Sequence, residues 1–134
     1  MKTTADLVKD WIRKADSDLA NARLCVASST ALDTACFHAQ QAAEKLIKAY
    51  LIAYGLPVPF IHNLEKLVEL CEQQEASFQS MKALGQALTP YAVQLRYDED
   101  FWPSEQETMN AVQSAQTLRA FIIPLLPAAM RPPK

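Results

Sequence analysis

The chain has 134 residues, of which 50% are hydrophobic and 21% are charged. This length suits one domain with one hydrophobic core, and the apolar content excludes a wholly disordered chain. The net charge of −2 provides no general cationic field for nonspecific nucleic-acid binding, so any RNA contact must be local. The sequence predicts a single helical domain over 1–127, followed by a flexible tail over 128–134.

The hydrophobic pattern has the period of an α-helix. The chain contains only two glycines, and no stretch alternates apolar and polar residues long enough to indicate a strand. A first helix is expected over 4–28, because Thr3 and Asp6 have the spacing of a capping box ahead of an apolar stripe. That stripe consists of Leu7, Trp11, Ala15, Leu19, Ala22 and Val26.

A second helix, predicted over 31–54, carries a seam of small side chains. The seam positions alternate steps of four and three residues, which places them on one face where another helix can approach closely. They are Ala35, Ala39, Ala42, Leu46, Ala49 and Ala53. Gly55 and the prolines after it end this helix. We expect the first two helices to lie side by side along the seam.

Two further helical segments are expected in the middle of the chain. Asn63 is a suitable cap for a short third helix. A fourth helix is predicted over 77–88, with a kink at Thr89 and Pro90 and a further turn or two over 91–96.

The last predicted helix begins at the capping box of Ser104 and Glu107 and ends at Pro124. Its apolar stripe consists of Val112, Ala115, Leu118, Phe121 and Ile122. Short connections between successive long helices favour antiparallel neighbours. The predicted fold class is therefore all-α, an up-and-down bundle of four main helices plus a short extra helix.

Cys25, Cys36 and Cys71 lie in apolar helical patterns without the paired spacing of zinc or redox motifs, so we expect reduced core thiols. The first residues contain no apolar signal core, and no apolar run reaches the roughly 18 residues of a membrane span. A cytoplasmic location without membrane contact is expected. The chain contains neither a Glu-x-x-His pair nor a Gly-rich phosphate loop, so no metal and no cofactor is expected.

Several motifs along the chain occur in the order of one known family. They are Trp11, residues 15–19 (Ala-Asp-Ser-Asp-Leu), residues 36–45 (Cys-Phe-His-Ala-Gln-Gln-Ala-Ala-Glu-Lys), residues 62–64 (His-Asn-Leu) and residues 96–97 (Arg-Tyr). In this order the sequence resembles the HEPN domain family over about residues 8–123, most specifically over 36–45. The resemblance implies a small helical bundle that commonly dimerises and is often paired with a minimal nucleotidyltransferase as toxin and antitoxin.

The resemblance also implies a test for activity, because catalytic members of the family are ribonucleases with an Arg-x4–6-His signature. After Arg96 the required positions hold Phe101, Trp102 and Pro103, and no other arginine of the chain has a His at that distance. The leading hypothesis is a non-catalytic or weakly catalytic HEPN-like module. Such a module would dimerise and bind a nucleotidyltransferase-type partner, a nucleotide or RNA.

Two alternatives remain open. A metal-independent, toxin-like ribonuclease could use Arg96 to stabilise charge on the phosphate and His38 to transfer the proton, if the bundle brings them together. The residues flanking His38 favour the other interpretation, in which His38 is a partly buried hydrogen-bonding residue that fixes helix packing. A purely structural helical adaptor is the other alternative.

A row of polar side chains follows a second face of the helix predicted over 31–54. His38, Gln41, Lys45 and Lys48 repeat there with the helical period. Gln41, Lys45 and Lys48 could receive the phosphate and the base of a nucleotide. Solvation is the competing interpretation, because Glu44 and Lys48 form an i,i+4 pair worth only about 0.3 kcal/mol on an exposed helix.

Arg96, Tyr97 and Trp102 combine a cation with aromatic rings on a predicted loop, a composition that can stack on a base or on a partner protein. The competing interpretation is that Tyr97 and Trp102 close the end of the core.

A second surface candidate is apolar. Trp11 and Ile12 on the first predicted helix, with Phe37 and Tyr50 on the second, are expected to form an exposed patch. A symmetric partner would cover such a patch, so a homodimer is expected.

Overall fold

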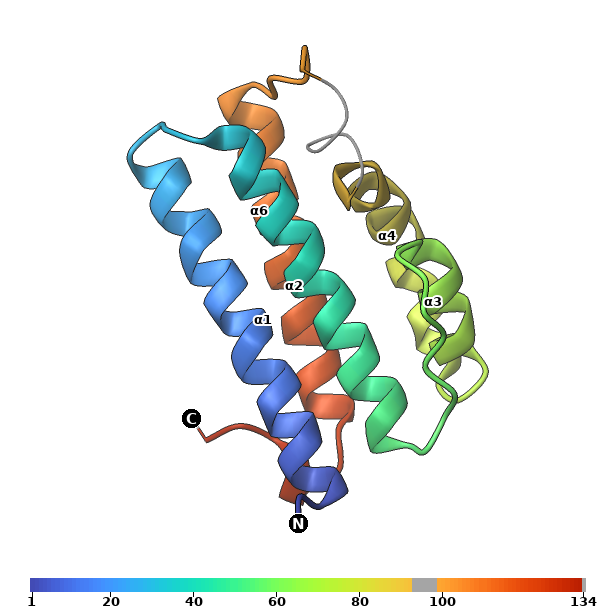
Figure 1. The fold of residues 1–134 in the computed structure, drawn as a ribbon. Coiled ribbons are helices and arrows are strands. Elements are labelled where there is room, and N and C mark those ends of the chain that lie inside the picture. The colour runs from blue at the N-terminus through green and yellow to red at the C-terminus, as the bar shows by residue number, and fades with distance from the viewer. Residues whose placement is uncertain (93–98, 134) are drawn as a thin grey trace.

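Three long helices form the centre of the fold: α1 (Thr4–Ala27), α2 (Leu32–Ala53) and α6 (Glu105–Ile122). The computed structural model describes residues 1–92 and 99–133, and within these ranges the secondary structure is helical, without a strand. Helices α1 and α2 run antiparallel and share the most extensive interface, while α6 also packs on α2 (Figure 1). The prediction of an all-α bundle is confirmed.

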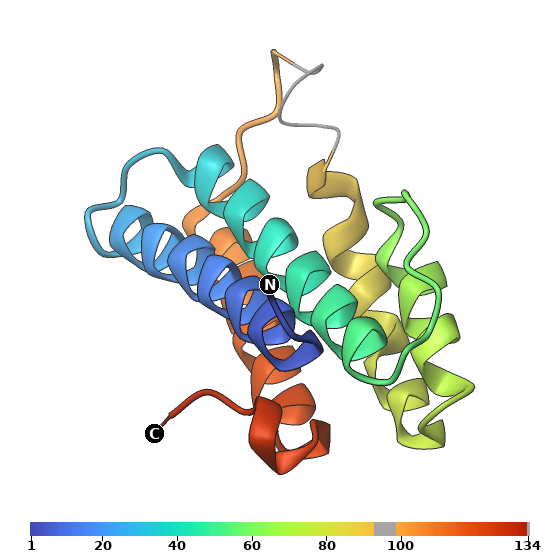
Figure 2. The ribbon, with the colours of Figure 1, turned by 60° about the horizontal axis from the view of Figure 1, so that its bottom comes forward.

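Short helices cover another side of α2. Helix α3 (Leu64–Glu72) is followed by the 3-10 helix η1 (Ala76–Met81), by α4 (Lys82–Leu88) and by the 3-10 helix η2 (Thr89–Ala92). Together they form a layer that α2 separates from α1 (Figures 1 and 2). Helix α2 is thus the central element of the bundle, with neighbours on several sides.

The fourth predicted helix is divided in the structure, since residues 76–81 are 3-10 and only α4 is α-helical. Local side-chain bonds account for the difference. The Glu75 carboxylate accepts hydrogen bonds from the backbone and hydroxyl of Ser77, and the Ser80 hydroxyl donates to the Ser77 carbonyl at 2.8 Å. Such bonds offer the backbone an alternative to α-helical pairing. The predicted continuation over 91–96 lies mostly outside the described residues.

The predicted caps are present. Thr3 and Asp6 form a reciprocal capping box at the start of α1, and Ser104 and Glu107 form another at the start of α6. The Asn63 side chain accepts a hydrogen bond from the Lys66 backbone at 3.1 Å and caps α3. Each cap satisfies backbone N–H groups that the first helical turn leaves unpaired.

Helix α2 ends in a motif that requires a left-handed residue. Gly55 has φ +68°, and its N–H bonds to the Ile52 carbonyl at 3.1 Å. The next N–H, of Leu56, bonds to the Leu51 carbonyl at 2.9 Å, which completes a Schellman motif. Glycine adopts this conformation without the steric cost of a Cβ atom, so the position of Gly55 fixes the end of the helix.

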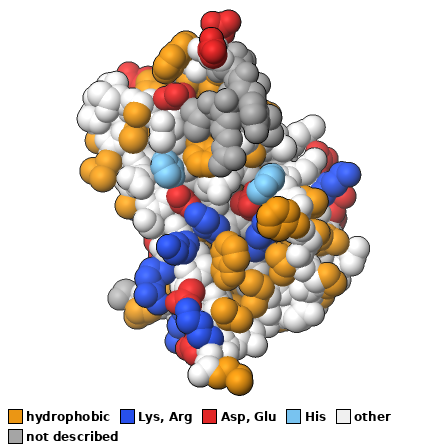
Figure 3. All heavy atoms as spheres, in the orientation of Figure 1, with side chains coloured by type: hydrophobic (Ala, Val, Ile, Leu, Met, Phe, Trp, Pro, Cys, Tyr) orange, Lys and Arg blue, Asp and Glu red, His pale blue; other side chains and the backbone are white. Residues whose placement is uncertain are grey.

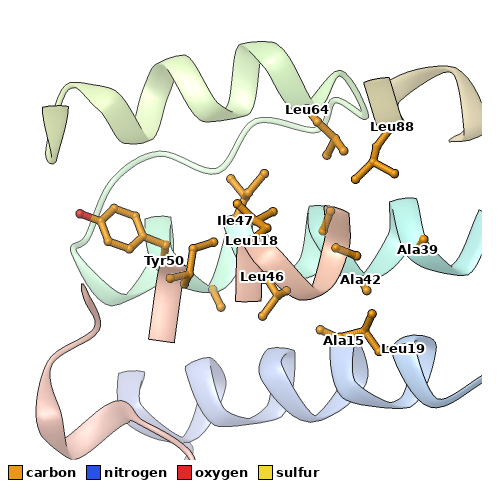
Figure 4. Packing of buried hydrophobic residues seen from close by; sticks show 14 of the residues in the cluster. Ala15, Leu19, Ala39, Ala42, Leu46, Ile47, Tyr50, Leu64, Leu88 and Leu118 are labelled. Carbon is orange, nitrogen blue, oxygen red and sulfur yellow. The ribbon is translucent and has the colours of Figure 1, made fainter. Parts of the chain in front are cut away.

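The alanine seam of α2 lies in the core as predicted. Ala35, Ala39, Ala42 and Ala49 are fully buried, and Ala53 at the end of the helix is partly buried. In Figure 4, Ala15 and Leu19 of α1 face Ala42 and Leu46 of α2, while Leu64 and Leu88 approach α2 from the opposite side. Small side chains on α2 therefore allow the close contact of α1 and α2.

The rotation of α1 differs from the prediction at its start. Val8 and Ile12 are buried, whereas Leu7 keeps 41% of its surface exposed. Each residue advances about 100° around a helix axis, so a step of four residues overshoots a full turn by about 40°. Two such steps, from Leu7 to Trp11 and from Trp11 to Ala15, therefore place Leu7 well away from the buried face on which Ala15 lies. The prediction that Leu7 belongs to the buried stripe of α1 was therefore wrong, and Val8 takes its place in the core.

The predicted exposed apolar patch is also wrong in part. Ile12 is 1% exposed and Tyr50 is 2% exposed, so both belong to the core. Trp11 and Phe37 are partly exposed. Ile12 follows the inward face of α1, and Tyr50 contacts the Phe78 ring with centroids 4.6 Å apart, which explains the burial of both.

The chain after α6 continues in two 3-10 turns, η3 (Ile123–Leu125) and η4 (Ala128–Met130). Arg131 donates to the carbonyl of Leu126 at 2.9 Å and to that of Pro124 at 2.8 Å. These bonds and the packing of η4 against α1 hold the first residues of the segment 128–134 close to the bundle. The flexibility of that tail stays a prediction.

Candidate functional site

The polar row on α2 divides into two clusters, each built around a carboxylate. His38 and Lys45 point toward α1, where both bind Asp18. Gln41 and Lys48 belong to a second cluster around Glu44, on the side of the segment that leads to α3. Figure 3 shows both histidines of the chain on one face, with lysine or arginine side chains between them.

The first cluster joins α1 to α2. Nδ1 of His38 lies 2.8 Å from Oδ1 of Asp18, and Nζ of Lys45 lies 2.6 Å from Oδ2 of the same carboxylate. An ionised carboxylate only accepts hydrogen bonds, so Nδ1 carries the proton and Nε2 of a neutral His38 is the acceptor. The side chain of His38 is 24% exposed, which leaves the ring accessible while Asp18 holds its orientation.

The ion pair at the centre of the second cluster is less accessible. Lys48 donates to Glu44 at 3.0 Å, and their side chains are 9% and 7% exposed. Glu44 also accepts from Gln40 at 3.2 Å and lies 2.9 Å from Nδ1 of His62. Gln41 donates to Gln40 at 2.7 Å and extends the network. The interpretation of Glu44 and Lys48 as a solvated surface pair is therefore wrong, because neighbouring elements cover both.

Two of the three loop candidates lie outside the described residues. Arg96 and Tyr97 belong to the segment 93–98, which the structure does not describe, so the predicted approach of His38 to Arg96 stays untested. Trp102 is 74% exposed, which argues against the interpretation that it closes the core.

A shallow hollow opens where the first half of α1 meets α2. Its volume is about 420 Å³, and its lining combines apolar side chains with charged ones: Leu7, Asp10, Trp11, Lys14 and Lys45. Lys45 belongs both to this lining and to the Asp18 cluster. The hollow therefore extends the polar face of α2 to the exposed side of α1.

Sequence reasoning missed Asp18 and Glu44 as the organising residues. A signal for Asp18 was available, because it lies beside Leu19 and between Ala15 and Ala22 on the buried stripe. A carboxylate at such a position needs a polar partner. No comparable signal identified Glu44, whose spacing from Lys48 suits an exposed pair equally well.

Neither a metal cluster nor a membrane helix is found in the part of the chain that the structure describes. No three His, Cys, Asp or Glu side chains come together there as a metal site requires. None of the helices described combines the length and the hydropathy of a bilayer-spanning segment.

The fold and the site together define a small all-helical bundle protein with a carboxylate-anchored polar row on its second helix. The sequence model of the HEPN domain matches residues 8–124. This match covers nearly the whole chain, so the chain belongs to the HEPN domain family.

Two solved structures are similar to this chain. TT1696 from Thermus thermophilus is 26% identical, with a TM-score of 0.72 over 86% of this chain and 94% of that chain. ST0689, described as an archaeal HEPN homologue, is 23% identical, with a TM-score of 0.68 over 91% of this chain and 96% of that chain. The comparison with curated proteins found no match.

Proposed function

We propose that this chain is a non-catalytic or weakly catalytic HEPN module of the cytoplasm. It dimerises and binds a nucleotidyltransferase-type protein partner, a nucleotide or RNA. The observation that carries the proposal is the preorganised face of α2, where the buried carboxylate of Asp18 holds part-exposed His38 and Lys45 in fixed positions. Side chains held in this way lose little conformational entropy when a ligand binds.

The expectation that the chain has little or no catalytic activity rests on its sequence. No arginine of the chain has a histidine at the distance of the Arg-x4–6-His signature. A ribonuclease without a metal needs a proton-transfer group and a cation beside the phosphate. His38 can supply the first, but Asp18 already neutralises the neighbouring Lys45.

The proposal is tested with the purified full chain. Light scattering should give twice the mass of one chain. A nucleotide or a short RNA should raise the melting temperature by selective binding to the folded state. Lys45→Gln should reduce that shift, whereas Lys82→Gln, at a part-exposed pair with Glu69 and Glu72, should not. A monomer that neither nucleotide, RNA nor a co-purified nucleotidyltransferase stabilises would contradict the proposal and favour a purely structural adaptor.

The contact between Asp18 and His38 favours one second candidate, a metal-independent ribonuclease that uses His38 with Arg96. A carboxylate that fixes the imidazole tautomer is a common device for orienting a general base. In this case His38→Ala and Arg96→Ala each abolish cleavage of a purified RNA, while the circular dichroism spectrum stays that of a helical bundle. Intact RNA after incubation with nuclease-free wild-type protein eliminates this candidate.

A further inference from the structure

The exposed side of the first half of α1 differs from a solvated helix face. Leu7 is 41% exposed and Trp11 partly exposed, and both line the hollow next to α2. Leu7 and Trp11 are four residues apart, about one helical turn, so their side chains are neighbours on the surface of α1. An apolar pair at the wall of a hollow can hold one apolar side chain of a partner.

Cations surround this apolar pair. Lys14 and Lys45 line the same hollow, and a neighbouring hollow of about 560 Å³ is lined by Lys2, Arg13 and Lys14 together with Asp10 and Ser17. Lys14 therefore lies at the boundary of the two hollows. Figure 3 shows a group of lysine and arginine side chains with acidic ones among them on this face.

The carboxylates of this surface are already paired. Asp10 binds both Lys2 and Arg13, and Asp18 binds Lys45. The hydrogen bond from Lys2 is the main cause that lowers the pKa of Asp10, so this carboxylate stays ionised and bound to its cations. Lys14 has no ion-pair partner among the described residues. Four cations against two carboxylates leave the surface positive in a chain whose net charge is −2.

We propose that this surface, defined by Leu7, Trp11, Lys14 and Lys45, is a docking site for an acidic peptide segment of a protein partner. The segment inserts one apolar side chain beside Leu7 and Trp11, and its carboxylates face Lys14 and the cations of the neighbouring hollow. Charge complementarity selects this occupant, because acidic groups steer toward a positive patch. The inference rests on the proposed binding of a protein partner and adds the surface and the chemistry of the partner segment.

The test uses fluorescence anisotropy with the full chain and a fluorescein-labelled peptide in which one leucine is flanked by glutamates. Two control peptides replace the glutamates by glutamine or the leucine by serine. The acidic peptide should bind more tightly than either control. Raising the salt concentration should weaken its binding, since exposed charges are screened within about 10 Å at 0.1 M salt.

Matched variants locate the site. Leu7→Glu and Lys14→Glu should each weaken binding by about tenfold or more, a free-energy loss of about 1.4 kcal/mol. Leu24→Glu changes another exposed leucine of α1, and Lys66→Glu makes the same charge change at an exposed position of α3 that lines neither hollow. Both controls should bind the peptide as the wild type does. All four positions are exposed, and circular dichroism checks that each variant folds.

Other outcomes overturn the inference. Equal affinity for the glutamine peptide would show that charge does not drive binding, and equal losses in the Leu24 or Lys66 variants would show that the peptide binds elsewhere. If ATP or a short RNA displaces the peptide and its own binding depends on Leu7, the surface serves nucleic acid instead. If Leu7→Glu turns a dimer into a monomer, a second copy covers the surface. A partner that binds both wild type and Leu7→Glu preserves the proposed function and eliminates this docking site.

Discussion

Lys48 donates a hydrogen bond of 3.0 Å to Glu44, one helical turn earlier on α2, and less than a tenth of either side chain is exposed. Breaking a buried ion pair leaves one charge without compensation and costs about 3–5 kcal/mol. Removing one partner of this pair is therefore expected to destabilise the protein far more than removing one partner of an exposed pair at the same spacing.

Glu44→Met should lower the free energy of unfolding by about 3–5 kcal/mol, because it leaves Lys48 charged and buried. Lys48→Met should cost less, since Glu44 keeps its bonds to Gln40 and His62. Urea denaturation measures both. Lys82→Met, at a surface pair, is the control and should change stability by about 1 kcal/mol or less. Equal small effects for all three variants would show that the Glu44 network does not stabilise the fold.

The alanine seam gives a second prediction. Ala42→Leu and Ala49→Leu should each destabilise the protein by about 1–3 kcal/mol or prevent folding, because both sites are fully buried where larger side chains have no space. Ala20→Leu is the matched control on an exposed position of α1 and should stay within about 0.5 kcal/mol. Thermal melts of the three variants compare them, and parent-like melting of the seam variants would contradict the packing of α1 on α2.

Alkaline pH should destabilise the fold. Burial raises the pKa of Tyr50 to about 12 and that of Cys71 to about 12, from ordinary values of 10.0 and 9.0. Between these ordinary values and about pH 12, the unfolded chain releases protons that the folded chain keeps. Since the folded state then binds more protons, the free energy of unfolding falls as the pH rises. The stabilisation is fully present below about pH 9 and is lost toward about pH 12.

Urea denaturation at several pH values from neutral to alkaline measures this loss. Tyr50→Phe should make the decline less steep, because it removes one of the groups whose pKa burial raises. Tyrosine absorbance of the folded protein should show Tyr50 and Tyr91 ionising later than an ordinary tyrosine, because burial raises the pKa of both rings. Constant stability across this range would exclude a raised pKa at both sites.

The cysteines should differ in reactivity. Cys36 and Cys71 are fully buried, and burial raises the pKa of each thiol, whereas Cys25 is partly exposed. A thiol reagent reacts with the thiolate, so the folded protein should modify at Cys25 first. The other two thiols should react at the rate of unfolding or after denaturation. Mass spectrometry of the partly labelled chain identifies the site, and early labelling of Cys71 would contradict its burial.

The helical core could be predicted because its signals are local. The seam from Ala35 to Ala49 follows the helical period, and the capping boxes at Thr3 and Ser104 each lie within four residues. Periodicity and capping depend on neighbours in sequence, so they are readable without coordinates. The rotation of α1 at Leu7 was harder to predict, since Leu7 and Val8 are both apolar and only the packing partner selects between them.

The site could be predicted only in part because its bonds join distant positions. His38 and Lys45 were recognised as polar residues on one face, but their shared partner Asp18 is 20 and 27 residues away. Glu44 bonds to Gln40 within one helical turn, but its contact with His62, 18 residues away, is one that a helical repeat does not identify. The sequence pattern could thus predict the polar face of α2, whereas tertiary packing determines which charged side chains of that face stay accessible.

The first residues of α1 and the turn η4 near the end of the chain lie at the same end of the bundle, where they are in contact (Figure 1). Chain ends that lie close together tolerate rewiring of the backbone. A circular permutant that joins these ends through a short linker and opens between Ser29 and Thr30 should keep the packing of the three long helices. In such a permutant, α1 is covalently connected to the C-terminal segment and no longer to α2. A comparison of its folding kinetics with those of the parent would show whether the pairing of α1 with α2 depends on their direct connection.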